Sequence, residues 1–281
     1  MIARPIYAVL EREVVRMLRQ KTRLVSAMVR PLIWLFVIGT GFGTVIGESR
    51  GVPYQTFLVP GVIGMTMLFG AMLAALTTVY DKESGVMRMM IIAPLPHFWI
   101  VIAKVLSAAL AAVLQALLLM ILLAALGYIS AKTDFILLAV LGYIRAKTDF
   151  ILLATALVFT SLACAGIGML TASFTRTLDN FAAIMNFVIF PVFFLSGSLY
   201  PVQDLPEVLR WVATVNPYTY GVDLLKHAVS GISPIATDFT RLTDIAVLIG
   251  FTMAAIAVSS WRFSRETAYE PMIHVLTGKR N

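Results

Sequence analysis

The chain has 281 residues, of which 59% are hydrophobic and 13% are charged, and its formal net charge is +7. Average soluble domains contain about 45–50% apolar and about 25% charged residues, so this composition predicts burial in lipid rather than a larger soluble core. Long apolar runs recur along the whole chain, which excludes a soluble catalytic domain carried on one membrane anchor.

Basic residues are concentrated at the N-terminus, where seven of the 22 Lys and Arg residues lie within the first 30 positions. Phospholipid headgroups are a simpler partner for this charge than nucleic acid, so we predict membrane lipids and no nucleic acid as partners. The one cysteine, Cys164, lies in an apolar run and is expected to be a small core residue.

The first predicted element, within residues 1–28, is an amphipathic helix. Apolar residues recur there at helical spacing, and a second face carries four arginines, Arg12, Arg16, Arg19 and Arg23. This pattern is typical of a helix lying along the cytoplasmic face of a membrane. A solvated basic face without a lipid role is the alternative.

Two predicted spans follow, at 29–47 and 57–80. Arg30 and Pro31 stand at the start of the first span, where proline is tolerated. The second span ends at three consecutive charged residues, 81–83, which open a loop that continues to residue 98.

The third predicted span covers residues 99–129, which as a helix is long enough to cross about 30 Å of hydrocarbon. Lys104 lies about one turn inside this span. Because a lysine stem is long, its ammonium can reach the inner interface, so we expect a structural interfacial lysine rather than a functional one.

A direct repeat comes next, because residues 121–135 and 136–150 differ at two positions, Ala125/Val140 and Ser130/Arg145. The repeat adds an apolar stretch of ten residues, which as a helix is about 15 Å long and therefore too short to span. It either extends the preceding helix beyond the bilayer or forms a re-entrant or interfacial segment on the outer face.

The rest of the chain alternates apolar and polar segments. In order, these are a fourth span at 151–174, a fifth span at 181–199 interrupted by Pro191 and Gly197, a polar outer segment at 200–243, a sixth span at 245–261 and a basic tail at 263–281.

Charge counting orients these segments. With the N-terminus inside, the inner segments hold 14 Lys and Arg residues and the outer loops hold seven. The positive-inside rule therefore predicts an all-α integral membrane protein with six spans within residues 29–262 and both termini cytoplasmic. A seventh span in the repeat would move the basic tail outside, which argues against it.

Motifs for catalysis and cofactor binding are missing from the sequence. No G-x-x-x-x-G-K-S/T loop occurs, and His97, His227 and His274 are scattered singly, so neither a nucleotide site nor a metal site is expected and the chain is not predicted to be an enzyme. The predicted spans hold essentially no buried carboxylate or histidine, which disfavours an ion-coupled carrier. A chain of this kind is expected to obtain its energy from another subunit.

Two stretches carry a family resemblance. The first is the loop Glu83-Ser84-Gly85-Val86 with Ile91-Ile92-Ala93-Pro94-Leu95-Pro96, running on to Lys104, and the second is Ser196-Gly197-Ser198-Leu199-Tyr200-Pro201 with Leu205-Pro206, Asn216-Pro217-Tyr218-Thr219-Tyr220 and Asp223. Their order, together with the amphipathic N-terminal helix and the six-span plan, resembles type-2 ABC exporter permeases over nearly the whole chain. The doubled block between spans three and four departs from that family.

The resemblance implies a homo- or heterodimer of permease subunits in the bacterial cytoplasmic membrane, docked on two ATPase subunits that use ATP and Mg. It also implies export of an amphiphilic, lipid-linked or hydrophobic substrate. The loop between spans two and three, residues 81–98, would insert into the ATPase through Glu83, Gly85, Arg88 and Pro94. Ordinary headgroup or solvent contacts are the alternative for these charges.

The outer segment also has a physical interpretation. Apolar residues between 205 and 212 share one helical face behind Pro201 and Pro206, and the segment continues through Trp211 and the pair Asn216-Pro217. This predicts a short re-entrant or interfacial helix that caps the exit, with a tryptophan-anchored interface helix as the alternative. A non-transporting scaffold or assembly factor, and less favoured a channel or secondary carrier, remain alternatives for the whole chain.

Overall fold

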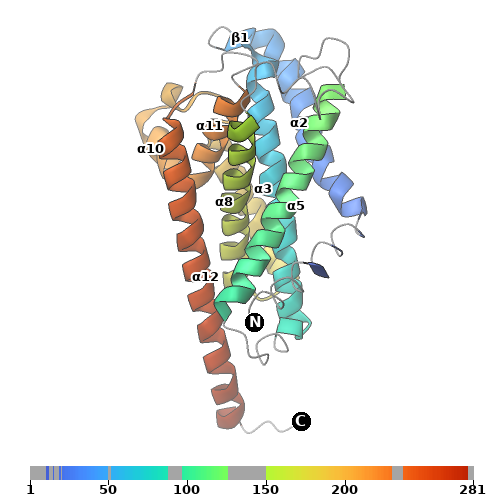
Figure 1. The fold of residues 1–281 in the computed structure, drawn as a ribbon, viewed down its shortest axis with the longest axis vertical. Helices are drawn as coiled ribbons and strands as arrows, with labels where there is room; N and C mark the ends of the chain where they lie inside the picture. The colour runs from blue at the N-terminus through green and yellow to red at the C-terminus, as the bar shows by residue number, and fades with distance from the viewer. Residues whose placement is uncertain are drawn as a thin grey trace.

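The computed structural model describes residues 11–12, 15, 19, 21–49, 52–87, 97–125, 150–229 and 237–277, and these are almost entirely helical (Figure 1). The described helices are α2 (Lys21–Ile46), α3 (Tyr54–Glu83), α5 (His97–Ala125), α8 (Phe150–Phe174), α9 (Leu178–Phe194), α10 (Glu207–Val215), α11 (Pro217–Val229) and α12 (Arg241–Thr277). A 3-10 turn, η1 (Val202–Asp204), and a two-residue antiparallel pair of strands, β1 (Glu48–Ser49) and β2 (Val52–Pro53), complete the described elements.

Helix α3 forms the centre of the bundle and packs against α2, α5, α8, α9 and α11. It is apolar on all sides, and its most apolar stretch is 89% buried, as expected for a helix enclosed by others. Glycines allow close approaches: a Cβ at Gly61 would lie 2.5 Å from the Ser198 carbonyl oxygen, and one at Gly64 would lie 2.6 Å from the Tyr218 hydroxyl.

Five of the predicted spans are confirmed as helices long and apolar enough to cross a membrane. These are Val29–Ile46, Tyr54–Glu83, Phe98–Leu123, Ile151–Phe174 and Arg241–Arg265. The all-helical membrane class predicted from composition is therefore confirmed, and Cys164 is buried as expected.

The predicted fifth span corresponds to α9, an apolar helix of 17 residues and about 26 Å. The prediction that it continues to residue 199 is wrong, because the helix ends at Phe194. Gly197 has a φ of +76°, a value that favours glycine, and the hydroxyls of Ser196 and Ser198 lie 2.7 Å apart in the turn that follows.

The first and last helices both run further than predicted. Helix α2 is continuous from Lys21, so the expected boundary at residue 28 is not a break, and Pro31 lies inside the helix rather than at its start. Neighbouring helices and local adjustments allow such prolines in membrane helices.

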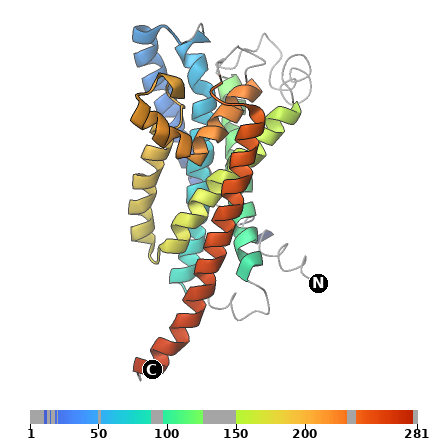
Figure 2. The ribbon, with the colours of Figure 1, turned by 90° about the vertical axis from the view of Figure 1, so that its left-hand side faces the viewer.

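Helix α12 reaches Thr277 and projects past the bundle (Figure 2), where the sequence predicted a tail after residue 262. Residues 126–149, which hold most of the repeat, lie outside the described residues.

Candidate functional site

The end of α3 carries three consecutive charged residues, of which Asp81 is the first. Its side chain is fully buried, contacts Lys104 on α5 and accepts a hydrogen bond from the Arg12 guanidinium at 3.0 Å. The Lys104 side chain is 1% exposed. The expectation that Lys104 extends to the membrane surface is therefore wrong, because a buried carboxylate on the neighbouring helix holds its ammonium inside the protein.

The next residue, Lys82, joins α3 to the end of α8. Its Nζ donates to the carbonyl oxygens of Ala172, Ser173 and Thr175 at 3.1, 3.0 and 3.3 Å. The last carbonyls of a helix have no partner within the helix, and a cation there interacts favourably with the helix dipole. Lys82 therefore caps α8 from a different helix.

The third residue, Glu83, joins α3 to the start of α9. Its carboxylate accepts a hydrogen bond from the backbone N–H of Leu178, the first residue of α9, at 3.0 Å. An anion at this position is favoured because helix N-termini carry unsatisfied N–H groups and partial positive charge. Glu83 itself is exposed, so its carboxylate also remains open to a partner.

Gly85 ends this region by turning the chain away from α3. Its φ is +75°, the N–H of Ser84 donates to the Tyr80 carbonyl at 2.9 Å, and the N–H of Gly85 donates to the Lys82 carbonyl at 3.2 Å. A left-handed glycine after the last helical turn is a common helix stop. Of the predicted coupling residues, Glu83 and Gly85 thus lie side by side at the end of α3, whereas Arg88 and Pro94 lie outside the described residues.

We call Asp81, Lys82, Glu83 and their partners the α3 junction. Through these contacts one short segment holds Arg12, α5, α8 and α9 together at one end of the bundle. The junction contains charged groups that position helices, and its arrangement suits transmission of a displacement from the following loop to several helices at once.

Of the four arginines predicted to bind lipid headgroups, the structure describes the side chains of two. Arg12 has a protein partner in Asp81, and Arg19 is exposed. The side chains of Arg16 and Arg23 lie outside the described residues. Binding of these arginines to lipid headgroups stays a prediction.

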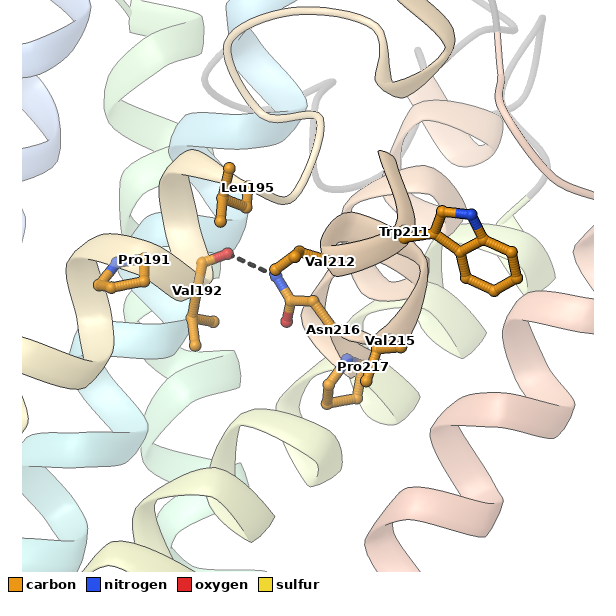
Figure 3. A pocket seen from close by; sticks show the side chains of 8 residues that line it. All are labelled: Pro191, Val192, Leu195, Trp211, Val212, Val215, Asn216 and Pro217. Atoms are coloured by element: carbon orange, nitrogen blue, oxygen red, sulfur yellow. Dashed lines mark hydrogen bonds between the residues drawn. The ribbon is translucent and has the colours of Figure 1, made fainter. Parts of the chain in front are cut away.

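The outer segment forms a groove between the end of α9 and α10 (Figure 3). Its volume is about 470 Å³, and its lining is Pro191, Val192, Leu195, Trp211, Val212, Val215, Asn216 and Pro217. The Asn216 amide donates to the Val192 carbonyl at 2.7 Å and its Oδ1 accepts from the Tyr218 N–H at 3.1 Å, which fixes the corner between α10 and α11. Of the predicted gate residues, Trp211, Asn216 and Pro217 line this groove, whereas Pro201 precedes η1 and Pro206 precedes α10.

A second group of buried charges lies at the end of the bundle opposite the α3 junction, between α11 and the start of α12. We call it the acidic cluster, and it consists of Asp223, Lys226, His227, Asp238 and Asp244. Lys226 Nζ lies 3.1 Å from Asp238 Oδ2 and 5.3 Å from the centre of the Phe57 ring on α3.

Asp223 joins α11 to the segment before α12. Its two carboxylate oxygens accept the backbone N–H groups of Asp238 and Phe239 at 2.8 and 2.9 Å. Burial raises the pKa of this carboxyl above its ordinary value, although the Asp238 N–H and the Lys226 ammonium act in the opposite direction.

Sequence reasoning missed the acidic cluster. It treated the histidines as isolated and found no buried carboxylate in the spans, whereas Asp244 is fully buried inside the last span. One signal was present, because Asp223 and His227 stand at i and i+4 and must share a helix face if residues 217–229 are helical. The contribution of α12 could not be read from any local pattern.

Comparison with known proteins decides the family. The family model described as ABC-2 type transporter matches residues 4–229 of this chain. The chain belongs to the ABC-2 type transporter family. Its members are permease subunits of ABC transporters and normally work with an ABC ATPase subunit, so this chain is a multi-pass membrane permease.

Individual relatives agree with this assignment. The permease is 28% identical over 210 residues to Nodulation protein J of Rhizobium leguminosarum bv. trifolii, which covers 74% of each chain. It is 24% identical over 232 residues to Inner membrane transport permease YadH of Escherichia coli K12, which covers 82% of this permease and 83% of that protein.

Proposed function

We propose that this permease is the membrane subunit of an ATP-driven exporter for an amphiphilic, lipid-linked or hydrophobic substrate. The observation that carries the proposal is the α3 junction, where the segment opening the loop between α3 and α5 holds Arg12, α5, α8 and α9 together. A partner that pushes on this loop moves several helices at once. A separate ATPase subunit, which binds ATP and Mg, supplies that motion.

We propose six spans, with α9 crossing beside the five longer helices. Its 17 residues stand at the lower limit of about 17–25 residues for a spanning helix. The excess of basic residues on the side of the N-terminus supports cytoplasmic placement of both termini. The name of the Escherichia coli relative, an inner membrane transport permease, supports the inner membrane of a bacterium as the location.

The proposed substrate class rests on the groove between α9 and α10. Its lining is almost wholly apolar and its volume of about 470 Å³ falls within the 300–1,000 Å³ of typical ligand sites. An apolar chain or ring system fits such a groove, while a polar group remains at the open side. In this proposal α10 acts as the interfacial helix that caps the exit.

We propose that the working unit contains a second permease subunit. Large apolar side chains are exposed on α2 and α9, with Val37 62% and Phe187 79% exposed. Lipid covers part of this surface, and a second copy or a related permease subunit covers another part.

The experiment is ATP-driven transport by the permease reconstituted in liposomes with its ATPase subunit. We expect Glu83→Ala to reduce ATP-coupled transport at least tenfold while membrane insertion is unchanged. The reason is that the hydrogen bond from the Leu178 N–H at the start of α9 to the Glu83 carboxylate is lost. Gly85→Pro should have the same effect, since proline cannot adopt a φ of +75°. Glu48→Ala is the matched control, because Glu48 is an exposed carboxylate at the other end of the bundle.

Unchanged transport in both loop variants would contradict the proposed coupling role of the α3 junction. If the wild-type permease neither associates with an ATPase subunit nor stimulates its turnover in liposomes, the non-transporting scaffold replaces the exporter.

A further inference from the structure

The acidic cluster carries more negative than positive charge. Among the described residues it holds three carboxylates and one ammonium, a net charge of −2 when His227 is neutral. The adjoining residues 230–236 contain no charged side chain. Burying uncompensated charge is costly, so a buried group of this kind requires a counterion or bound protons.

Asp244 is the least satisfied member of the cluster. Its side chain is 0% exposed, and neither carboxylate oxygen has a hydrogen-bond partner in the part of the chain that the structure describes. Its Oδ2 lies 3.8 Å from His227 Nε2, so the carboxylate is directed into the cluster. A buried carboxylate without a donor indicates that a partner is missing, which is either a cation or a bound proton.

The geometry points to a site for one divalent transition-metal ion between α11 and α12, held by His227, Asp223, Asp244 and the carbonyl oxygen of Phe239. His227 Nε2 lies 3.7 Å from Asp223 Oδ2 and 3.0 Å from the Phe239 oxygen. One ligand atom from each of Asp223, His227 and Asp244 lies within 4.8 Å of the other two. Ligands at about 2.0–2.2 Å from a tetrahedral metal are about 3.4 Å apart, so small side-chain movements complete the site.

The hydrogen bond of His227 fits this assignment. A carbonyl oxygen can only accept, so in the metal-free protein Nε2 carries a proton and donates it to Phe239. A metal ion takes the place of this proton, with the imidazole in its Nδ1–H tautomer. The Phe239 carbonyl oxygen becomes the fourth ligand after a small shift, since it now lies 3.0 Å from Nε2 and ligands on one tetrahedral metal are about 3.4 Å apart.

The donor set selects among metals. One imidazole nitrogen and three oxygens suit Zn²⁺ and related transition ions, whereas Mg²⁺ and Ca²⁺ prefer oxygen ligands alone. A divalent ion also neutralises the net charge of −2. The ion would join α11 to the start of α12, since Asp223 and His227 lie on the first and Asp244 on the second.

The test uses the full-length permease without a polyhistidine tag, stripped of metal by a chelator in detergent. Zn²⁺ binding is measured by competition with a fluorescent zinc chelator. We expect one Zn²⁺ per chain, no competition from millimolar Mg²⁺, and at least a tenfold loss of affinity in Asp244→Asn. Glu207→Gln, which changes an exposed carboxylate on α10, should bind as the wild type does.

X-ray absorption of the wild-type Zn²⁺ complex gives a readout that needs no variant. One imidazole nitrogen with oxygen ligands at about 2.0–2.2 Å supports the site. Two or more imidazoles would place the ion elsewhere and overturn the assignment. Absence of saturable binding at one ion per chain, or unchanged affinity in a monodisperse Asp244→Asn protein, would also overturn it and leave protons as the compensating charge.

Discussion

The two ends of the helix bundle hold buried charge in opposite ways. At the α3 junction, the buried carboxylate of Asp81 has both Lys104 and Arg12 as partners. In the acidic cluster, Lys226 faces three carboxylates, and Asp244 has no hydrogen-bond donor among the described residues. Removing one cation from the first end leaves a compensating charge in place, whereas removing Lys226 from the second leaves none among the residues that the structure describes. Compensated charge positions helices, and excess charge indicates a binding site.

Lys226→Met should have the largest effect on stability. It removes the ammonium of the acidic cluster and leaves three buried carboxylates with no Lys or Arg partner in the described part of the chain, so we expect a loss near the upper end of the about 3–5 kcal/mol typical of a broken buried pair. The measurement is the thermal unfolding midpoint of the metal-free permease in detergent. Partial recovery in the double variant Lys226→Met/Asp238→Asn would confirm that the loss is electrostatic, while a neutral single variant would contradict the comparison.

Lys104→Met should have a smaller effect, near 3 kcal/mol, because Arg12 continues to neutralise Asp81. The same unfolding measurement applies. The variant Lys104→Met/Asp81→Asn should recover most of the stability but not ATP-coupled transport, since the link between α3 and α5 stays broken. Equal losses of stability in the Lys104→Met and Lys226→Met variants would show that the two ends of the bundle do not differ in charge compensation.

Asp244→Asn should have the smallest effect and the opposite sign. Removing one negative charge from the acidic cluster in metal-free protein relieves repulsion, so we expect a gain of about 0–1 kcal/mol. Zn²⁺ should raise the unfolding midpoint of the wild type more than that of Asp244→Asn, because the stabilisation by a ligand increases with its affinity. A clear destabilisation of the metal-free variant would mean that Asp244 is already compensated.

Much of the fold followed from apolar segment length, because a helix in lipid must satisfy its backbone internally over about 20 residues. This reasoning found five spans and the helix at α9. It placed helix ends less well: α2 continues across Pro31, and α9 stops at Phe194 rather than at residue 199. Those ends depend on neighbouring helices and on the turn at Gly197, which have no periodic signal.

The candidate sites were partly predictable because their charged and turn-forming residues interrupt apolar segments. The charged residues 81–83 stood out because they interrupt an apolar run, but their partners on α5, α8 and α9 did not. Trp211, Asn216 and Pro217 were named from the sequence and line the groove against α9, which the sequence did not indicate, and their gate role stays a prediction.

By itself the sequence determined that this protein lies in a membrane, where its apolar helices run, and that one charged loop interrupts them. Tertiary structure alone decided which charges meet. Lys104 lies inside the protein because Asp81 belongs to the adjacent helix, and His227 lies against Asp244 because α11 packs on α12. Hydrophobicity depends on each residue separately and can be read along a chain, whereas electrostatic compensation depends on distances between residues far apart in it.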